Sequence, residues 1–291
     1  STSLSNSVIA SAISKKAEQA NKSVGIHIKI DTGMGRLGIQ PEGFISLLNN
    51  VISYKNLKIE GIFTHLSSAD EEDPETTHHQ ISIFLNVLKK LRTTNFSKMI
   101  SENDHIFFHS ANTAGLLRFP ESRFNLVRPG ISLFGSFPSP TTASVFDVLA
   151  KENKITKLRP VMNWKTKIIQ IQTLRKGVPI SYGGRYVTKN DRTLIATIPV
   201  GYADGLSRRL SNNMELLVKE TRVKQVGTIC MDMCLIDITN LPDVRMGEEV
   251  VIFGSQGKGQ IKVEELATKA DTIPYEILCG VGKRVPRIYI S

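Results

Sequence analysis

The stretch "IKIDTGMGRLGI", residues 28–39, joins a strand to a tight turn and defines the architecture of the first half of the chain. Ile28 and Ile30 alternate with Lys29 and Asp31, which predicts a strand with one apolar face and one polar face. Polar side chains at the C-terminal end of a parallel strand are typical of the open end of a (β/α)8 barrel, where such barrels carry their active sites.

The turn that follows this strand is rich in glycine. Gly33 and Gly35 permit backbone conformations that other residues resist, and Arg36 comes next. Taken alone, these residues favour an ordinary tight turn with a surface arginine. The inward-facing set of His27, Lys29 and Asp31 favours a functional site instead, because a buried Lys29 needs an anionic partner or a chemical change.

Outward from this strand, helices and strands alternate through the first half of the chain. Helices are predicted at Ser5–Ala20, Glu42–Tyr54, Glu75–Leu91 and after Asn112, and strands at Val24–Asp31, Leu57–Leu66, His105–His109 and Val127–Phe134. Such alternation predicts a parallel sheet. Four strands cannot close an eight-stranded barrel, so we predict the C-terminal half of a (β/α)8 (TIM-like) barrel.

The second half of the chain has a different pattern, dominated by strands. Strands are predicted at Trp164–Gln172, Thr193–Pro199, Arg222–Ile238 and Glu249–Phe253, with one helix at Val263–Ala270. We therefore predict a partial barrel domain at residues 1–155 and a β-rich domain at residues 156–291. Pro138–Lys157 is the candidate linker.

Composition and charge narrow the class of protein. The 291 residues are 41% hydrophobic and 22% charged, as in globular proteins, and carry a formal net charge of +10. Lysine and arginine are spread along the chain, which does not favour nucleic-acid binding. We expect neither a membrane segment nor a signal peptide. The three cysteines lack metal-ligand spacing, so we expect reduced thiols in the cytoplasm and no metal.

Three more motifs of the first half end in polar or glycine residues. "FTHLSSADEED" (63–73) carries His65, "FHSANTAGLLRFP" (108–120) places Asn112 and Thr113 at a helix start, and "LVRPGISLFG" (126–135) carries Arg128, Gly130 and Ile131. Free N–H groups at a helix start favour an anion, so the last two motifs together could hold a phosphate. A lone histidine is more often structural, and Asn112 is also an ordinary helix cap.

Tyrosines stand out in the second half. "PISYGGRYV" (179–187) contains Tyr182, and "PVGYADGLSRRL" (199–210) contains Tyr202. Each tyrosine follows an apolar strand and precedes a glycine turn, a place where tyrosine usually packs or anchors the turn. "GTICMDMC" (227–234) adds Met231 and Asp232 between two cysteines.

Together, these motifs closely resemble one family. The order KxDTGMGRLG, THxxxAD, ANxxxxLRFP, VRPGISLFG, SYGxxY, GYADG, CMD and RVPR is similar to alanine racemase, a pyridoxal 5'-phosphate (PLP) enzyme with a barrel and a β domain. The resemblance runs from about residue 24 to residue 291. It implies an isomerase that interconverts L- and D-alanine by two-base proton transfer at Cα and supplies D-alanine for peptidoglycan.

The resemblance also implies roles for residues of the barrel domain, which would bind PLP. Arg36 matches the arginine that bonds the phenolic oxygen of the cofactor and lies near the substrate, and Lys29 matches a lysine that is often carbamylated. Arg128 matches the arginine that faces the pyridine nitrogen, and His65 the histidine near the ring. Asn112, Thr113, Gly130 and Ile131 match the phosphate side of the cofactor site.

In the β domain, Tyr182 matches the catalytic tyrosine, one of the two acid–base groups. Tyr202, Met231 and Asp232 match the substrate entrance and the contact with the substrate carboxylate. In the family these residues come from a partner subunit, so the resemblance implies a homodimer with shared active sites.

Two departures from the family pattern stand out. The motif Val-Lys-Ala-Asn-Ala-Tyr-Gly-His-Gly, which carries the Schiff-base lysine, does not occur in this sequence. We therefore expect a C-terminal portion of a longer polypeptide, inactive without its N-terminal segment; the alternative is a non-catalytic relic that binds PLP or another anion, or dimerises. The residue before the RVPR motif is Lys283, where many members place a phosphate-binding tyrosine, and lysine can still bind phosphate.

Overall fold

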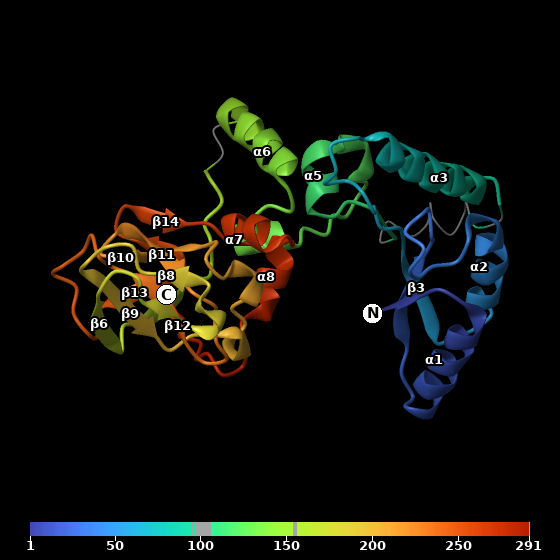
Figure 1. The fold of residues 1–291 in the computed structure, drawn as a ribbon. Coiled ribbons are helices and arrows are strands. Elements are labelled where there is room, and N and C mark those ends of the chain that lie inside the picture. Colours follow the sequence, from blue (N-terminus) through green and yellow to red (C-terminus); the bar gives the residue numbers. More distant parts are fainter. Residues whose placement is uncertain (95, 97–105, 154–155, 291) are drawn as a thin grey trace. The chain divides into compact units, whose positions relative to one another are not determined.

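The computed structural model describes residues 1–94, 96, 106–153 and 156–290. The chain divides into two compact units (Figure 1). Unit 1 comprises residues 1–132 and 139–157, and unit 2 comprises residues 133–138 and 158–291. In the described part of the chain, no helix is long and apolar enough to cross a membrane, and no group of three or more His, Cys, Asp or Glu side chains is placed to hold a metal ion.

Unit 1 is built on a parallel four-stranded sheet in the order β1-β2-β3-β4. Its strands are β1 (Thr2–Leu4), β2 (Val24–Lys29), β3 (Leu57–Phe63) and β4 (Phe107–His109), and its longer helices are α1 (Ser7–Gln19), α2 (Phe44–Ile52), α3 (Glu75–Arg92) and α6 (Pro140–Asn153). Ile26, Ile28 and Ile30 are fully buried and pack with Phe44 and Phe84 of the helices. By the alternation of the strand, His27 and Lys29 face the opposite side.

The prediction of a strand at Val127–Phe134 was wrong. Residues 127–130 have no regular structure, and a short 3-10 helix, η3 (Ile131–Phe134), follows. Pro129 has no N–H to donate to a sheet. The fourth strand is instead β1, whose three residues pair with β2 at the other side of the sheet and are too few to show an alternating pattern.

The candidate linker Pro138–Lys157 is mostly helical and not an irregular linker. Most of it forms α6, which belongs to unit 1 and buries Thr142 and Phe146. Pro140 stands at the first helical position, where its missing N–H costs nothing. The two prolines therefore mark the start of a helix. The predicted strand at His105–His109 is β4, and the first residue of that prediction lies outside the described residues.

Unit 2 contains an eight-stranded sheet in the order β14-β13-β10-β11-β12-β9-β6, with β5 paired to β13. The strands are β5 (Trp164–Lys167), β6 (Gln170–Leu174), β9 (Thr193–Ile198), β10 (Glu215–Val218), β11 (Thr221–Val226), β12 (Cys234–Asp237), β13 (Glu249–Gln256) and β14 (Gly259–Ile261). A separate hairpin joins β7 (Pro179–Ile180) to β8 (Tyr186–Val187). Two helices, α7 (Val263–Ala270) and α8 (Pro274–Gly280), complete the unit.

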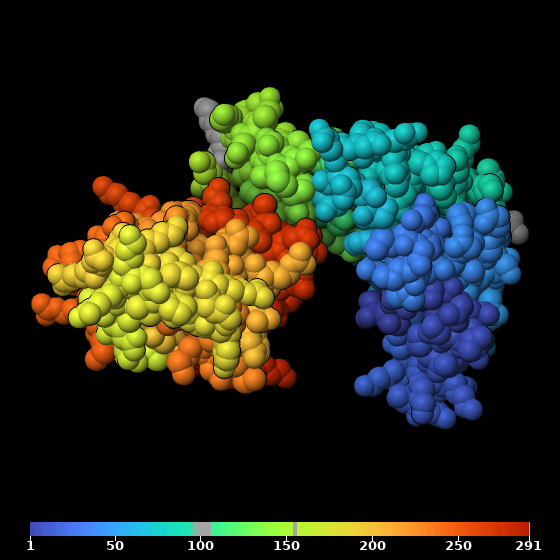
Figure 2. Space-filling view, in the orientation of Figure 1, coloured from blue at the N-terminus to red at the C-terminus, as the bar shows by residue number. Residues whose placement is uncertain are grey.

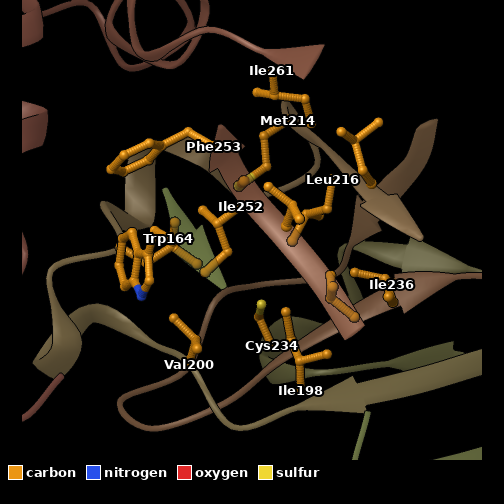
Figure 3. Packing of buried hydrophobic residues seen from close by; sticks show 14 of the residues in the cluster. Trp164, Ile198, Val200, Met214, Leu216, Cys234, Ile236, Ile252, Phe253 and Ile261 are labelled. Atoms are coloured by element: carbon orange, nitrogen blue, oxygen red, sulfur yellow. The ribbon is translucent and has the colours of Figure 1, made fainter. Parts of the chain in front are cut away.

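The core of unit 2 is one large apolar cluster. Trp164 and Phe253 meet edge to face with ring centroids 5.9 Å apart, and Ile198, Leu216 and Ile252 belong to the same cluster (Figure 3). Two predicted strands proved to be pairs of strands. Trp164–Gln172 divides into β5 and β6, and Arg222–Ile238 divides into β11 and β12, so residues 227–233 form a loop between β11 and β12.

Candidate active site

The turn after β2 is anchored by Asp31. One carboxylate oxygen, Oδ1, accepts hydrogen bonds from the backbone N–H groups of Gly33, Met34 and Gly35 at 3.1, 2.9 and 3.1 Å. Burial favours the neutral acid, but these three bonds and the nearby Lys29 hold the pKa of Asp31 below its usual value. Asp31 is therefore an anion, and its role is to stabilise the backbone conformation of the turn.

Lys29 is buried, with 6% of its surface exposed, as the sequence predicted. Its Nζ donates to the carbonyl of Leu37, which lies on the far side of the turn. Burial lowers the pKa of Lys29; Asp31 opposes that shift, and the positive charges of Arg36 and Arg128 add to it. The Arg36 side chain is exposed on the turn, and its positive charge acts on Lys29 electrostatically.

Arg128 connects the ends of two strands. Its Nη2 donates to the carbonyl of Thr64 at 2.8 Å, just after β3, and to that of Ser110 at 3.1 Å, just after β4. Its guanidinium carbon lies 5.3 Å from the centre of the Phe63 ring, a cation–π contact. Burial lowers the pKa of Arg128 to about 10, so the guanidinium still carries its charge at neutral pH.

Arg128, His109 and His27 form a chain of hydrogen bonds. Nη1 of Arg128 donates to Nδ1 of His109, so the proton of a neutral His109 must be on Nε2. That Nε2 lies 2.9 Å from Nδ1 of His27 and donates to it. Burial, helped by Arg128 and His27, lowers the pKa of His109 to about 3. Burial, helped by Arg128, Arg36 and Lys29, lowers the pKa of His65 to about 4. Both His109 and His65 are therefore neutral at neutral pH.

The predicted phosphate motifs do come together. The hydroxyl oxygen of Thr113 accepts a hydrogen bond from the Gly130 N–H at 2.8 Å and lies 3.3 Å from the hydroxyl of Ser132. The side-chain oxygen of Asn112 accepts from the Gly115 N–H at 2.9 Å, as a cap of the short helix α5 (Thr113–Arg118). The ordinary capping role of Asn112 is therefore present. Ile131 is buried at the start of η3.

In unit 2, Tyr202 and Met231 lie side by side. The Tyr202 N–H donates to the carbonyl of Cys230 at 3.1 Å, and the Ala203 N–H donates to that of Met231 at 3.0 Å. Gly201 makes this approach possible, since a Cβ atom there would lie 2.3 Å from both carbonyl oxygens. Tyr202 and Met231 are nevertheless exposed, so both side chains are available to a ligand.

The RVPR motif stabilises the same corner of unit 2. Arg284 Nη2 lies 2.7 Å from Asp232 Oδ1, and its Nε lies 3.4 Å from Asp204 Oδ1. Lys283, the preceding residue, is exposed.

Tyr182 is 70% exposed, in a short 3-10 helix (Tyr182–Gly184) between β7 and β8. Figure 2 shows the yellow segment around residues 180–200 at the surface of unit 2.

Comparisons with known proteins agree over most of the chain. The model of the alanine racemase N-terminal domain matches residues 1–138, and that of the alanine racemase C-terminal domain matches residues 161–289. The alanine racemase of Halothermothrix orenii is 42% identical over 278 residues, which are 96% of this chain and 69% of that protein. That of Methanococcus maripaludis is 38% identical over 97% of this chain and 71% of its own length.

The chain belongs to the alanine racemase family. Solved structures of the family agree: alanine racemase from a D-cycloserine-producing Streptomyces lavendulae is 30% identical, with a TM-score of 0.87 over 99% of this chain and 72% of that one. The Bacillus anthracis enzyme with bound L-Ala-P is 34% identical, with a TM-score of 0.81 over 99% of this chain and 70% of that one. The predicted fold class is confirmed, and unit 1 supplies four parallel strands of the family's barrel domain.

His109, which lies in the "FHSANTAGLLRFP" motif, was not predicted as a site residue. It ends β4 in the same way that His65 ends the "FTH" segment after β3, so a search for polar residues at strand ends would have found it. The expectation that a lysine-bearing segment lies outside these residues stays a prediction.

The low histidine pKa values predict a pH dependence of stability. Below about pH 6.5 the unfolded chain binds protons at His109 and His65, whereas the folded chain does so only near pH 3 and 4. Stability is therefore full above about pH 6.5, and we expect the free energy of unfolding to fall by roughly 2–4 kcal/mol as the pH falls from about 6.5 to 3. Urea unfolding followed by circular dichroism measures this change.

The contribution of His109 is isolated by substitution. His109→Gln should reduce the loss of stability between these pH values, since glutamine does not titrate. Asn86→Gln, at an exposed position of α3 that does not titrate, is the control for the substitution itself and should leave the pH dependence as it is. An unchanged pH dependence in His109→Gln would contradict the assignment of a neutral, buried His109.

Proposed function

We propose that this isomerase interconverts L-alanine and D-alanine, with pyridoxal 5'-phosphate as its cofactor. The observation that carries the proposal is the setting of Arg128, which is charged, partly buried and held at fixed carbonyl oxygens after β3 and β4. When bound, PLP withdraws electrons from Cα of the amino acid and so makes its hydrogen acidic.

The residues of unit 1 fit this cofactor. A guanidinium gives up no proton at neutral pH, so Arg128 beside the pyridine nitrogen would keep that nitrogen unprotonated. His65 and His109 are neutral and have low pKa values, so neither offers the ring a proton. The Thr113–Gly130 contact, with Asn112 and Ile131 beside it, supports a phosphate site, and the exposed Lys283 of unit 2 is proposed as a further phosphate contact.

Lys29 is proposed to carry a carbamate that orients Arg36. Its lowered pKa increases the neutral amine, which is the form that adds CO2 and releases a proton. We expect a carbamate signal in the 13C NMR spectrum of protein kept in 13C-labelled bicarbonate, lost in Lys29→Gln but kept in Lys55→Gln, a lysine outside the proposed site. A spectrum without a signal that depends on Lys29 would exclude the modification.

One of the two acid–base groups is assigned to unit 2. Racemisation requires a proton to leave one face of Cα and another to arrive on the opposite face. We propose that Tyr182 is the group on one face, and that the second group is the lysine of the family motif. Tyr202, Met231 and Asp232, with Arg36, would bind the substrate. The Tyr202–Cys230 and Ala203–Met231 backbone bonds and the Arg284–Asp232 ion pair support this assignment.

We propose two further features on the basis of the family. Residues 1–155 would form the PLP-binding domain and residues 156–291 the β-rich domain of a cytoplasmic homodimer. The exposed positions of Tyr182 and Tyr202 support this assignment, because these side chains would need a partner surface to make an enclosed site.

The function is tested by measuring D-alanine formed from L-alanine, with D-amino-acid oxidase as the coupling enzyme and PLP added. The natural full-length polypeptide should form D-alanine, and omission of PLP after dialysis against hydroxylamine should abolish this. Absorbance between about 400 and 430 nm after addition of PLP reports on the cofactor separately. If this absorbance appears but no D-alanine is formed, the chain is the cofactor-binding relic.

A further inference from the structure

The backbone of unit 2 is strained at the residue before Tyr182. Ser181 has φ 62° and ψ −178°, a combination that glycine adopts and other residues avoid. The contrast is Asp271, whose φ 55° and ψ 55° are the ordinary left-handed values at the end of a helix. Ser181 persists in this conformation only because its surroundings determine it.

Two reciprocal hydrogen bonds hold this conformation. The Ser181 hydroxyl donates to the carbonyl of Thr228 at 2.6 Å, and the Thr228 hydroxyl donates to the carbonyl of Tyr182 at 2.8 Å. Thr228 is buried, so its hydroxyl has little water to bond instead. We call this pair of bonds between residues 181–182 and residue 228 the clasp.

The residue before Thr228, Gly227, is itself held in place. Gly227, with φ 77°, meets Ser181 so closely that a Cβ atom on the glycine would lie 2.7 Å from the Ser181 Cβ. The Gly227 N–H donates to Asn212 Oδ1 at 2.6 Å, and the buried Gln225 donates through Nε2 to the Gly227 carbonyl at 2.9 Å. Both backbone groups of Gly227 are thus fixed.

We infer that Ser181 and Thr228 are positioning residues for Tyr182, an inference that rests on the acid–base role proposed for that tyrosine. The Tyr182 ring is mostly exposed, so packing within unit 2 fixes it only weakly. The clasp fixes its backbone instead, and with it the direction of the Cα–Cβ bond. A misplacement of about 1 Å of an acid–base group can cost on the order of 10²-fold in rate, which gives a reason to retain the strain.

The test uses mild variants of the full-length enzyme. Ser181→Gly removes both the strain and the hydroxyl, so we expect an equal or higher melting temperature but a kcat lower by about tenfold or more, with KM changed by less than about threefold. Thr228→Val should lower kcat in the same way, and Thr228→Ser should restore it. Lys219→Gly, which relieves a left-handed residue (φ 48°) in the β10–β11 turn, is the control and should leave kcat unchanged.

A second measurement needs no cofactor. With 3-fluorotyrosine incorporated, the 19F signal that disappears in Tyr182→Phe reports on this ring. We expect that signal to move toward the free-peptide position in Ser181→Gly and in Thr228→Val, and to stay in place in Lys219→Gly. An unmoved signal together with an unchanged kcat would overturn the inference.

Failure of the proposed function has a different signature. If Tyr182→Phe keeps its activity, the acid–base role of Tyr182 is wrong and the inference fails with it. If Tyr182→Phe loses activity while Ser181→Gly and Thr228→Val keep it, only the positioning role is wrong. In the Tyr182→Phe background, Ser181→Gly should cause no further loss, because both changes act through one hydroxyl.

Discussion

Tyr182→Phe is expected to lower alanine racemisation by about 10²–10⁴-fold, because it removes the hydroxyl of one of the two acid–base groups. Enantiomers have equal free energies, so kcat/KM must fall equally in both directions. The distinguishing measurement is exchange of the Cα hydrogen in D2O. Exchange should persist for the enantiomer whose proton is taken by the other base, and should be lost for its mirror image.

Tyr186→Phe is the matched control. Tyr186 lies four residues further on, and its hydroxyl donates to Asp237 at 3.1 Å, so its hydroxyl has a structural partner within unit 2. Burial and the Asp237 carboxylate raise its pKa, which makes it a poor proton donor. Racemisation in Tyr186→Phe should stay close to that of the unaltered enzyme. Similar losses in both variants would remove the special role of Tyr182.

Arg128→Glu is expected to lower racemisation by about 10²–10³-fold, the usual cost of losing a preorganised charged donor. Glutamate beside the pyridine nitrogen would favour its protonation, so the ratio of transamination to racemisation should rise. Two carbonyl oxygens, of Thr64 and Ser110, would also lose their donor. Pyridoxamine phosphate measured by chromatography, together with D-alanine formed, gives this ratio.

A readout that is independent of the cofactor accompanies this variant. The positive charge of Arg128 helps to hold the pKa of His109 at about 3, so the pKa should rise in Arg128→Glu, as measured by histidine NMR titration. Arg123→Glu is the control: Arg123 donates to the carbonyl of Leu116 at 2.9 Å and is also partly buried. An unchanged His109 pKa in Arg128→Glu would contradict the described contact.

The strand at residues 24–31 was predictable because its alternation is long and clear. Its apolar positions pack against helices, and Lys29 is buried on the other face, as the pattern requires. The strand predicted at Val127–Phe134 has the same apolar content, but Pro129 removes a donor and the backbone of Gly130 bonds a threonine side chain. Pro129 is visible in the sequence and counts against a strand, whereas the bond from the Gly130 N–H to Thr113 appears only in the structure.

The residues proposed for the site were named from their motifs, whereas the contacts between them could not be read from the sequence. Arg128 was predicted from its motif, but its bonds to the carbonyls of Thr64 and Ser110 depend on β3 and β4, which are adjacent in the sheet and far apart in the sequence. Ser181 gave no signal, because the letters "SYGG" suggest that the glycines carry the unusual backbone. The strained conformation falls on the serine.

The carbonyl contacts of Arg128 have a consequence for the thermodynamics of cofactor uptake. Because the guanidinium is already held by Thr64, Ser110 and His109, an incoming aromatic ring would not have to immobilise a free arginine side chain. Ordering such a side chain on binding costs about 0.5–1.5 kcal/mol. Titration calorimetry of the unaltered protein should therefore show a smaller entropic penalty than that of Thr64→Pro or Ser110→Pro, in which the surrounding backbone is disturbed.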